Sequence, residues 1–341
     1  MSENSKIEWT DHTFNPWEGC QKIGPGCDHC YAETRNARFA GGTAINWGPG
    51  AVRRRTSVAN WRKPLQWNAN HERFFADHGR RQRVFCASLA DVFDNAVDTQ
   101  WRADLFDLIS QTPNLDWLLL TKRIGNAERM MAASRFELAT RADLSAGPLV
   151  PAWPWPNVWI GATICNQEEA DRDIPKLLAV PAAVRFLSME PLLGPVNLSV
   201  IDIDGHSEIY PLGGTAGCED DDGNPAPDLP ALDWVIAGGE SGPGARPMHP
   251  DWARGLRDQC AAADVPFLFK QWGDWVPRGP ESMGYPLVEG VSRLRLTDLG
   301  DNGSALVANG GNEVWMQRVG KKVSGRLLDG VHHDRFPQIN D

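Results

Sequence analysis

The sequence is 341 residues long, with 42% hydrophobic and 23% charged residues and a formal net charge of -10. This length allows one large α/β domain or two smaller ones, and the composition excludes a disordered chain. No apolar run reaches the length of a membrane span, and the polar N-terminus lacks the apolar core of a secretory signal. We therefore expect a cytoplasmic protein with no membrane partner.

The negative charge is concentrated in one segment of the chain. Nine acidic residues and no Lys or Arg lie between Asp202 and Asp233. Outside this segment the acidic and basic residues are nearly equal in number, so the net charge leaves room for a basic face that contacts nucleic acid. We interpret residues 200–232, which are also rich in Gly and Pro, as a surface insertion.

First in chain order is the three-cysteine loop "WEGCQKIGPGCDHCYAE", in which Cys20, Cys27 and Cys30 follow a predicted first strand. The C-x6-C-x2-C spacing favours a metal centre, because a chain without a secretory signal is not expected to form structural disulfides. Two kinds of centre remain open. One is a structural zinc site with His29 or His12 as the fourth ligand. The other is a four-iron four-sulfur cluster with one iron open to a small molecule.

The next segment, "AVRRRTSVANWRKPLQW", interleaves basic and aromatic residues. Arginines can neutralise phosphates and tryptophans can stack on bases, so we predict a nucleic-acid contact here. The alternative is a solvated basic loop whose tryptophans pack on the barrel. The candidate residues are Arg53, Arg54, Arg55, Trp61, Arg62 and Lys63.

Six short apolar runs without polar alternation follow, which is typical of parallel strands buried on both faces. Amphipathic stretches predict helices near residues 98–110, 167–180 and 249–263, the second interrupted or restarted at Pro175. This alternation predicts an α/β fold, a partial (β/α) barrel of six or seven parallel strands over residues 1–285, with a C-terminal extension over 286–341. The apolar runs span residues 83–89, 116–121, 157–163, 184–189, 233–239 and 266–272.

Three cysteines after the first strand of a partial barrel resemble the radical S-adenosylmethionine (radical SAM) superfamily. The ending "CDHCYAE" resembles the "CxxCYA" of its spore photoproduct lyase-like branch, which acts on DNA. The resemblance implies a cluster whose open iron binds SAM and, with an external electron donor, generates a 5′-deoxyadenosyl radical. The first gap of six residues departs from the spacing C-x3-C-x2-C that is usual in that superfamily.

A resemblance over most of the chain is to the phage-associated three-cysteine-motif family of unknown function (DUF5131-like). It implies a phage or mobile-element setting and a dedicated protein partner, and it leaves the reaction open. The motifs that carry it are "WTDHTFNPWEGC", "GCDHCYAE", "SLADVFD", "LLLTKR", "WIGATICNQ", "LSMEPLLGPV", "VIAGGESGPGARPMHPDW", "FLFKQWG" and "GRLLDG".

Polar residues and glycines end most of the predicted strands. In βα barrels function gathers at the carboxyl ends of the strands. A SAM site needs carboxylates or hydroxyls, cations and closely approached backbone, so we predict that these residues bind the cofactor. They are Ser88, Asp91, Lys122, Thr163, Asn166, Glu190, Gly238, Gly239, Glu240 and Lys270.

Together these observations predict an iron–sulfur radical SAM-like enzyme that modifies or repairs a nucleic-acid base or nucleotide. Its metal ligands would be Cys20, Cys27 and Cys30. One alternative is a zinc protein that binds DNA or a protein partner without catalysis. Another is an iron–sulfur protein for electron transfer or sensing that does not use SAM. The sequence assigns no catalytic residue.

Overall fold

The computed structural model describes residues 5–141, 152–203, 208–214, 223, 229–298 and 312–338. Seven parallel strands form the curled sheet of a partial βα barrel, in the order β1-β4-β5-β6-β7-β10-β11. The predicted fold class is therefore confirmed, and every predicted apolar run contains a strand. The strands are β1 (His12–Phe14), β4 (Gln82–Cys86), β5 (Leu115–Thr121), β6 (Val158–Thr163), β7 (Val184–Met189), β10 (Trp234–Gly238) and β11 (Phe267–Gln271).

The strands are buried along nearly their whole length. Leu118 and Leu119 of β5 are fully buried, as are Val158 and Ile160 of β6. Parallel pairing places Leu118 opposite Trp159. Unbroken apolar runs are what a sheet covered on both faces requires, so the sequence pattern and the sheet agree.

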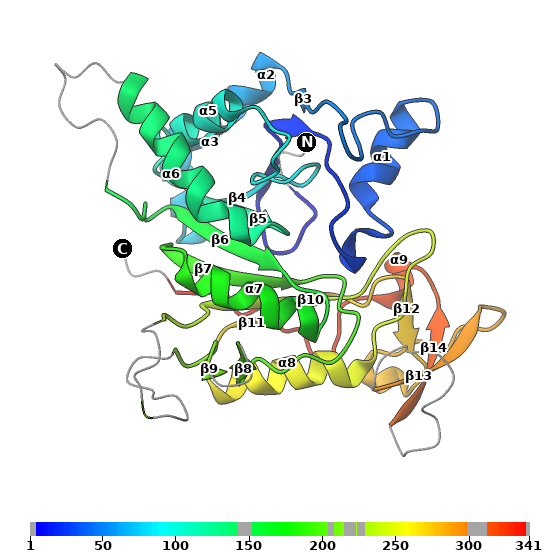
Figure 1. Ribbon diagram of the computed structural model, residues 1–341. Helices are drawn as coiled ribbons and strands as arrows, with labels where there is room; N and C mark the ends of the chain where they lie inside the picture. The colour runs from blue at the N-terminus through cyan, green and yellow to red at the C-terminus, as the bar shows by residue number, and fades with distance from the viewer. Residues whose placement is uncertain are drawn as a thin grey trace. The chain divides into compact units, whose positions relative to one another are not determined.

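The chain divides into two compact units, and the first comprises Met1–Ile23, Cys30–Ala162 and Val180–Val184. In this unit α5 and α6 lie side by side (Figure 1), and a two-stranded sheet pairs β2 (Trp17–Glu18) with β3 (Arg54–Arg55). Asp98 begins α5 by accepting a hydrogen bond from the Gln100 amide at 2.8 Å. The helices are α1 (Tyr31–Phe39), α2 (Val58–Trp61), α3 (Lys63–Ala69), α4 (His71–His78), α5 (Thr99–Ser110) and α6 (Ile124–Arg141).

The second unit comprises Gly24–His29, Thr163–Ala179 and Arg185–Asp341. Here α8 packs against β10 and β11, and β12, β14 and β13 form an antiparallel sheet (Figure 1). Because β12 precedes residue 285, this sheet draws on both sides of the predicted domain boundary, which itself stays a prediction. The elements are η1 (Pro25–Cys27), α7 (Gln167–Ala179), β8 (Ile201–Asp202), β9 (Glu208–Ile209), α8 (Pro250–Ala262), β12 (Trp275–Pro277), η3 (Glu281–Met283), β13 (Arg293–Thr297), β14 (Glu313–Arg318) and α9 (Lys321–Ser324).

Two expectations about local structure need correction. The predicted break at Pro175 is wrong, because α7 continues through it. A proline in a helix interior costs about 3 kcal/mol, and the buried face formed by Ile174, Leu177 and Leu178 offsets that cost. The basic segment is also no loop, since it contains β3, α2 and α3. Most of the predicted acidic insertion lies outside the described residues.

Among the helices that the structure describes, none has both the length and the apolar character needed to cross a membrane. This agrees with the absence of a long apolar run in the sequence.

An ion-pair cluster on α8 makes stability depend on pH. Asp329 binds Arg254 at 2.6 Å and Arg257 at 2.8 Å, and Tyr285 donates to it at 2.9 Å. Arg254 above all, then Arg257 and Tyr285, hold the pKa of the Asp329 carboxyl well below its usual range. A depressed carboxyl pKa stabilises the fold above the unfolded value, near 4, and this contribution is lost as the pH falls through the folded value.

We expect Asp329→Asn to lower the free energy of unfolding by about 2 kcal/mol at pH 7. Asparagine suits this position because Asp329 has a positive φ of 55°. The deficit should shrink as the pH falls below about 4, and urea unfolding at several pH values measures it. Asp258→Asn, which removes an exposed partner of Arg257, is the matched control and should cost less than about 1 kcal/mol. A deficit of the same size at pH 3 and pH 7 would contradict this account.

Candidate functional site

In the first unit, predicted site residues gather around the buried carboxylate of Asp91. It accepts hydrogen bonds from Thr121 Oγ1 at 2.7 Å and from the Lys122 amide at 3.0 Å, both at the carboxyl end of β5. The Phe93 amide donates at 2.9 Å, and Arg123 pairs with it at 3.1 Å. These donors satisfy the hydrogen-bonding capacity of a carboxylate that is 4% exposed. Asp91 therefore links the ends of β4 and β5, with both oxygens already engaged.

Arg123 connects this carboxylate to the first cysteine of the loop. Its guanidinium donates to Cys20 Sγ at 3.5 Å and to the Gln21 carbonyl at 2.7 Å. Burial raises the pKa of the Cys20 thiol to about 11, and the charge of Asp91 adds to this rise while Arg123 opposes it. A metal ion would displace the thiol proton, and hydrogen bonds to ligand sulfurs tune iron–sulfur centres. Arg123 thus lies within hydrogen-bond distance of the Cys20 sulfur.

Ser88 takes part in a second set of contacts in the first unit. Asn15 donates to Ser88 Oγ at 3.0 Å and accepts from the Leu89 amide at 2.7 Å. The Tyr31 hydroxyl donates to the Ser88 carbonyl. Because Tyr31 directly follows Cys30, this contact ties that end of the cysteine loop to the segment after β4.

In the second unit, Glu190 and Lys270 form an ion pair at the ends of β7 and β11. Lys270 Nζ donates to Glu190 Oε2 at 2.9 Å, and Ser188 Oγ lies 3.3 Å from the same oxygen. Gly238 permits this packing, since a Cβ there would lie 2.5 Å from Glu190 Oε1. Within the described residues, Glu190 Oε1 and Gln271 Oε1 are buried acceptors without a hydrogen-bond partner. A buried acceptor without a donor costs free energy, so these two oxygens have unused capacity to accept hydrogen bonds.

Two other predicted cofactor residues, Asn166 and Gly239, make contacts that stabilise the fold, and a third, Thr163, is buried. Asn166 Oδ1 accepts from the Glu169 amide at 2.9 Å, and the Glu169 carboxylate accepts from the Cys165 amide at 2.9 Å, which together cap α7. Gly239 lies so close to the Trp272 carbonyl that a Cβ would be 2.0 Å from its oxygen. Thr163 ends β6 and is 7% exposed.

Glu240 does not present a free carboxylate. It accepts hydrogen bonds from Arg246 Nη2 at 2.7 Å and Nε at 2.9 Å, and it contacts His29 Nδ1 at 3.0 Å. Burial acts to raise the pKa of Glu240, but the hydrogen bonds from Arg246 and His29 outweigh it and hold the pKa below its usual range. The other histidine considered for a zinc site, His12, stacks on Trp67 with ring centroids 4.1 Å apart.

The predicted metal centre is not assembled in the described part of the structure. Among the residues with described positions, no group of three or more His, Cys, Asp or Glu side chains is arranged to hold a metal ion, and no disulfide forms. Cys20 and Cys30 belong to the first unit and Cys27 to the second. Thiols with a guanidinium beside one sulfur suit a thiolate-bound iron centre. The assignment of the three cysteines as ligands stays a prediction.

The predicted nucleic-acid residues differ widely in exposure. Arg53 is 3% exposed, and its Nε lies 2.7 Å from Asp94 Oδ2. This guanidinium is buried and does not reach the surface where a phosphate would bind. Arg53 is therefore removed from the predicted nucleic-acid residues. Arg54 and Arg62 are exposed, and Lys63 is half-buried.

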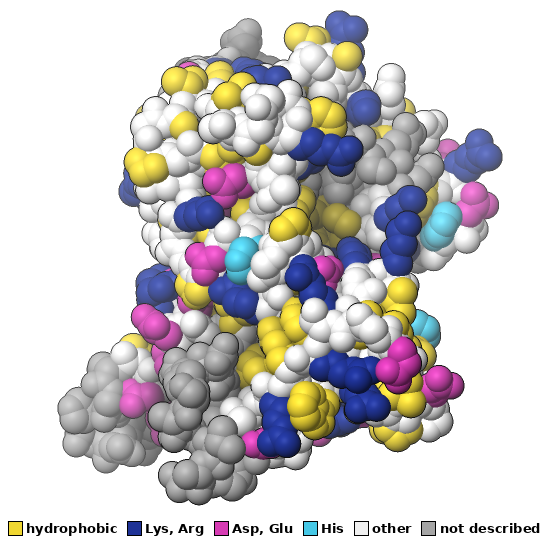
Figure 2. Space-filling view, turned by 90° about the vertical axis from the view of Figure 1, so that its right-hand side faces the viewer, with side chains coloured by type: hydrophobic (Ala, Val, Ile, Leu, Met, Phe, Trp, Pro, Cys, Tyr) yellow, Lys and Arg dark blue, Asp and Glu magenta, His cyan; other side chains and the backbone are white. Residues whose placement is uncertain are grey.

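The aromatic member of this set is also engaged within the chain. Arg55 lies over the Trp61 ring, 4.5 Å from its centroid, and pairs with Asp104 at 2.7 Å. Phe14 meets the same ring edge-on at 5.7 Å. On the face drawn in Figure 2, Lys and Arg side chains are interspersed with Asp and Glu side chains. Any phosphate contact here therefore rests on a few exposed arginines.

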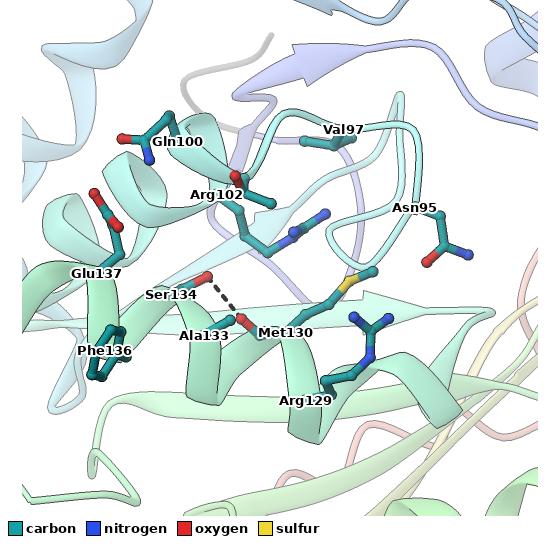
Figure 3. Close-up of a pocket in the computed structure, with 11 residues that line it drawn as sticks. Asn95, Val97, Gln100, Arg102, Arg129, Met130, Ala133, Ser134, Phe136 and Glu137 are labelled. Carbon is teal, nitrogen blue, oxygen red and sulfur yellow. Dashed lines mark hydrogen bonds between the residues drawn. The ribbon is translucent and has the colours of Figure 1, made fainter.

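A groove of about 400 Å³ lies between α5 and α6, and its lining includes none of the predicted site residues (Figure 3). Arg102 enters it but donates to the Val92 and Asp94 carbonyls at 2.9 and 2.8 Å. Ser134 Oγ donates to the Met130 carbonyl. Arg102 and Ser134 thus stabilise the fold, and no cysteine is among the residues that line the groove.

Sequence reasoning missed three residues that organise these clusters. Asn15, Arg123 and Arg246 were not among the predicted site residues. Their motifs, "TFNPW", "LLLTKR" and "GGESGPGAR", contain the residues. Local spacing does not reveal that Asn15 contacts Ser88 or that Arg123 contacts Asp91, because these partners are distant in the sequence. Glu240, in contrast, lies only six residues before Arg246.

The family model DUF5131, described as a protein of unknown function, matches residues 4–337, which is nearly the whole chain. No curated protein matches the chain, and no solved structure does.

We expect Asp91→Asn to lower the free energy of unfolding by about 3–5 kcal/mol, because it leaves Arg123 without its buried partner and turns an amide NH2 toward donors. Urea unfolding measures this loss. The control is Asp107→Asn, at a half-buried position of α5. It should change the free energy of unfolding by less than about 0.5 kcal/mol. Equal effects of the two substitutions would show that Asp91 is not the link described above.

Proposed function

The chain belongs to the DUF5131 family, and we propose that it is an iron–sulfur, radical SAM-like enzyme. Cys20, Cys27 and Cys30 would hold a four-iron four-sulfur cluster. The observation that carries the proposal is the hydrogen bond from Arg123, at the carboxyl end of β5, to the sulfur of Cys20. The positive charge of Arg123 favours the thiolate form of Cys20. Arg123 also lies at the carboxyl end of a strand, where βα barrels carry their functional residues.

The orphaned acceptors of the second unit support SAM as the small-molecule ligand. SAM has ribose hydroxyls and an ammonium group, which are the donors that Glu190 Oε1 and Gln271 Oε1 lack. Lys270 pairs with the other oxygen of Glu190 at 2.9 Å. When bound to a cluster that an external donor has reduced, SAM supplies a 5′-deoxyadenosyl radical.

We propose a nucleic-acid base or nucleotide as the substrate, modified or repaired by hydrogen abstraction. Exposed Arg54 and Arg62 support it, because guanidinium groups at the surface neutralise phosphates. The proposal includes a dedicated protein partner and a cytoplasmic location, where cysteine thiols stay reduced.

Anaerobic purification tests the metal. The chain should contain about four iron and four sulfide, with a broad absorption near 400 nm. Replacing Cys20, Cys27 or Cys30 by alanine should each remove most of the iron, since three thiolates are the minimum that holds such a cluster. Cys260→Ala, at a buried cysteine of α8, is the control and should keep the full iron content.

Other outcomes of this experiment overturn the proposal in different ways. One zinc per chain without iron would favour the structural zinc protein. A reduced cluster that releases no 5′-deoxyadenosine from SAM would favour electron transfer or sensing.

The substrate class is tested by binding to a single-stranded oligonucleotide. We expect Arg54→Gln with Arg62→Gln to weaken binding roughly tenfold at low salt and to reduce the slope of log affinity against log salt by about 1.4. Fluorescence anisotropy at several salt concentrations measures both quantities. Arg295→Gln, at an arginine whose side chain is 60% exposed on β13, should leave the slope unchanged. If the double variant and this control behave alike, the predicted contact is wrong.

A further inference from the structure

The segment that carries Cys27 is tethered by one arginine of the second unit. Arg246 Nη2 donates to the Pro25 carbonyl at 2.8 Å, and Nη1 donates to Asp28 Oδ2 at 3.1 Å. These two partners lie on either side of Cys27, which is 7% exposed. A single guanidinium therefore contacts this turn before and after its cysteine.

Glu240 fixes the plane of that guanidinium. Its two oxygens accept from Arg246 Nη2 at 2.7 Å and from Nε at 2.9 Å, in the bidentate arrangement that sets orientation as well as distance. The Arg246 amide donates to Glu240 Oε2 at 2.8 Å as well. Because Glu240 lies two residues after the end of β10 and is 7% exposed, the tether is anchored next to the sheet.

Close packing holds both ends of the same segment. His29 Nδ1 lies 3.0 Å from Glu240 Oε2, and a Cβ at Gly244 would be 2.7 Å from His29 Nε2. At the other end, a Cβ at Gly24 would be 2.5 Å from Glu169 Oε1. The turn can sit this close only because both neighbouring positions are glycine.

We propose that Arg246, braced by Glu240, is a positioning residue that holds the Cys27 turn in one conformation and shields its thiol. Glu240 then orients the loop through Arg246 rather than binding a cofactor. Fixing the backbone of each residue costs about 1–2 kcal/mol of conformational entropy, and this turn contains Gly24 and Gly26. The hydrogen bonds from Arg246 offset this entropy cost when the chain folds, so the turn is already ordered before any ligand binds.

Arg123 shows the same arrangement in the first unit. It pairs with Asp91, which follows β4, and donates to the Gln21 carbonyl. Each arginine thus combines a buried carboxylate with a backbone carbonyl of the three-cysteine loop. That the tether prepares a metal ligand rests on the proposed function, whereas the tether itself does not.

Thiol alkylation in the metal-free, reduced full-length protein tests the tether directly. Iodoacetamide labelling of Cys27, followed by peptide mass spectrometry, should be slow in the wild-type protein. We expect Arg246→Gln to speed labelling of Cys27 roughly tenfold, because the turn opens locally more often. Labelling of Cys260 should stay unchanged. Arg246→Lys keeps one donor but not the bidentate fork, so it should give an intermediate rate.

Arg254→Gln is the matched control, since Arg254 is another arginine of the second unit with carboxylate partners, Asp251 and Asp329. It should leave labelling of Cys27 slow. An unchanged Cys27 rate in Arg246→Gln overturns the proposal. So does an equal acceleration of Cys27 in both variants together with Cys260, which would indicate general destabilisation.

Iron binding separates this proposal from the proposed function. If the wild-type protein binds iron, Arg246→Gln should lower the iron retained after dilution, and Arg246→Lys should partly restore it. If the wild-type protein binds no iron, the iron–sulfur proposal fails, while the labelling result still decides whether the tether exists.

Discussion

A carboxylate removed from water must be met by a cation or by several hydrogen bonds, and this constraint organises the ends of the strands. Asp91 and Glu240 are each less than 8% exposed, and each is paired with an arginine and with backbone amides. Leaving either charge unpaired would cost several kcal/mol. The two arginines are consequently held in place by the fold.

A guanidinium has more donors than one carboxylate can accept, and the surplus reaches the cysteine loop. Arg123 uses its remaining N–H groups on Cys20 and on the Gln21 carbonyl, and Arg246 uses its own on the Pro25 carbonyl and Asp28. A Gly- and Pro-containing loop would otherwise sample many conformations. The residues that hold the strand ends therefore also order the cysteine-bearing segment in their own unit.

Much of the fold was predictable because burial on both faces leaves a simple signature. The apolar runs of β4, β5, β6, β7, β10 and β11 were all found from the sequence. Local signals failed where tertiary packing outweighed them. Pro175 remains inside α7, and Arg53 is drawn into the interior by Asp94. Neither the favourable burial of one helix face nor a partner forty residues away is visible in local composition.

The sequence by itself determined the parallel sheet, the three-cysteine loop and the polar residues that end the strands, because these depend on periodicity and spacing along the chain. Only the tertiary structure decided which of those polar residues are engaged. It paired Glu240 with Arg246 and Asp91 with Arg123, and it left Glu190 Oε1 buried without a partner among the described residues. Hydrogen bonds form between neighbours in space, and the folding of the strands sets those neighbours.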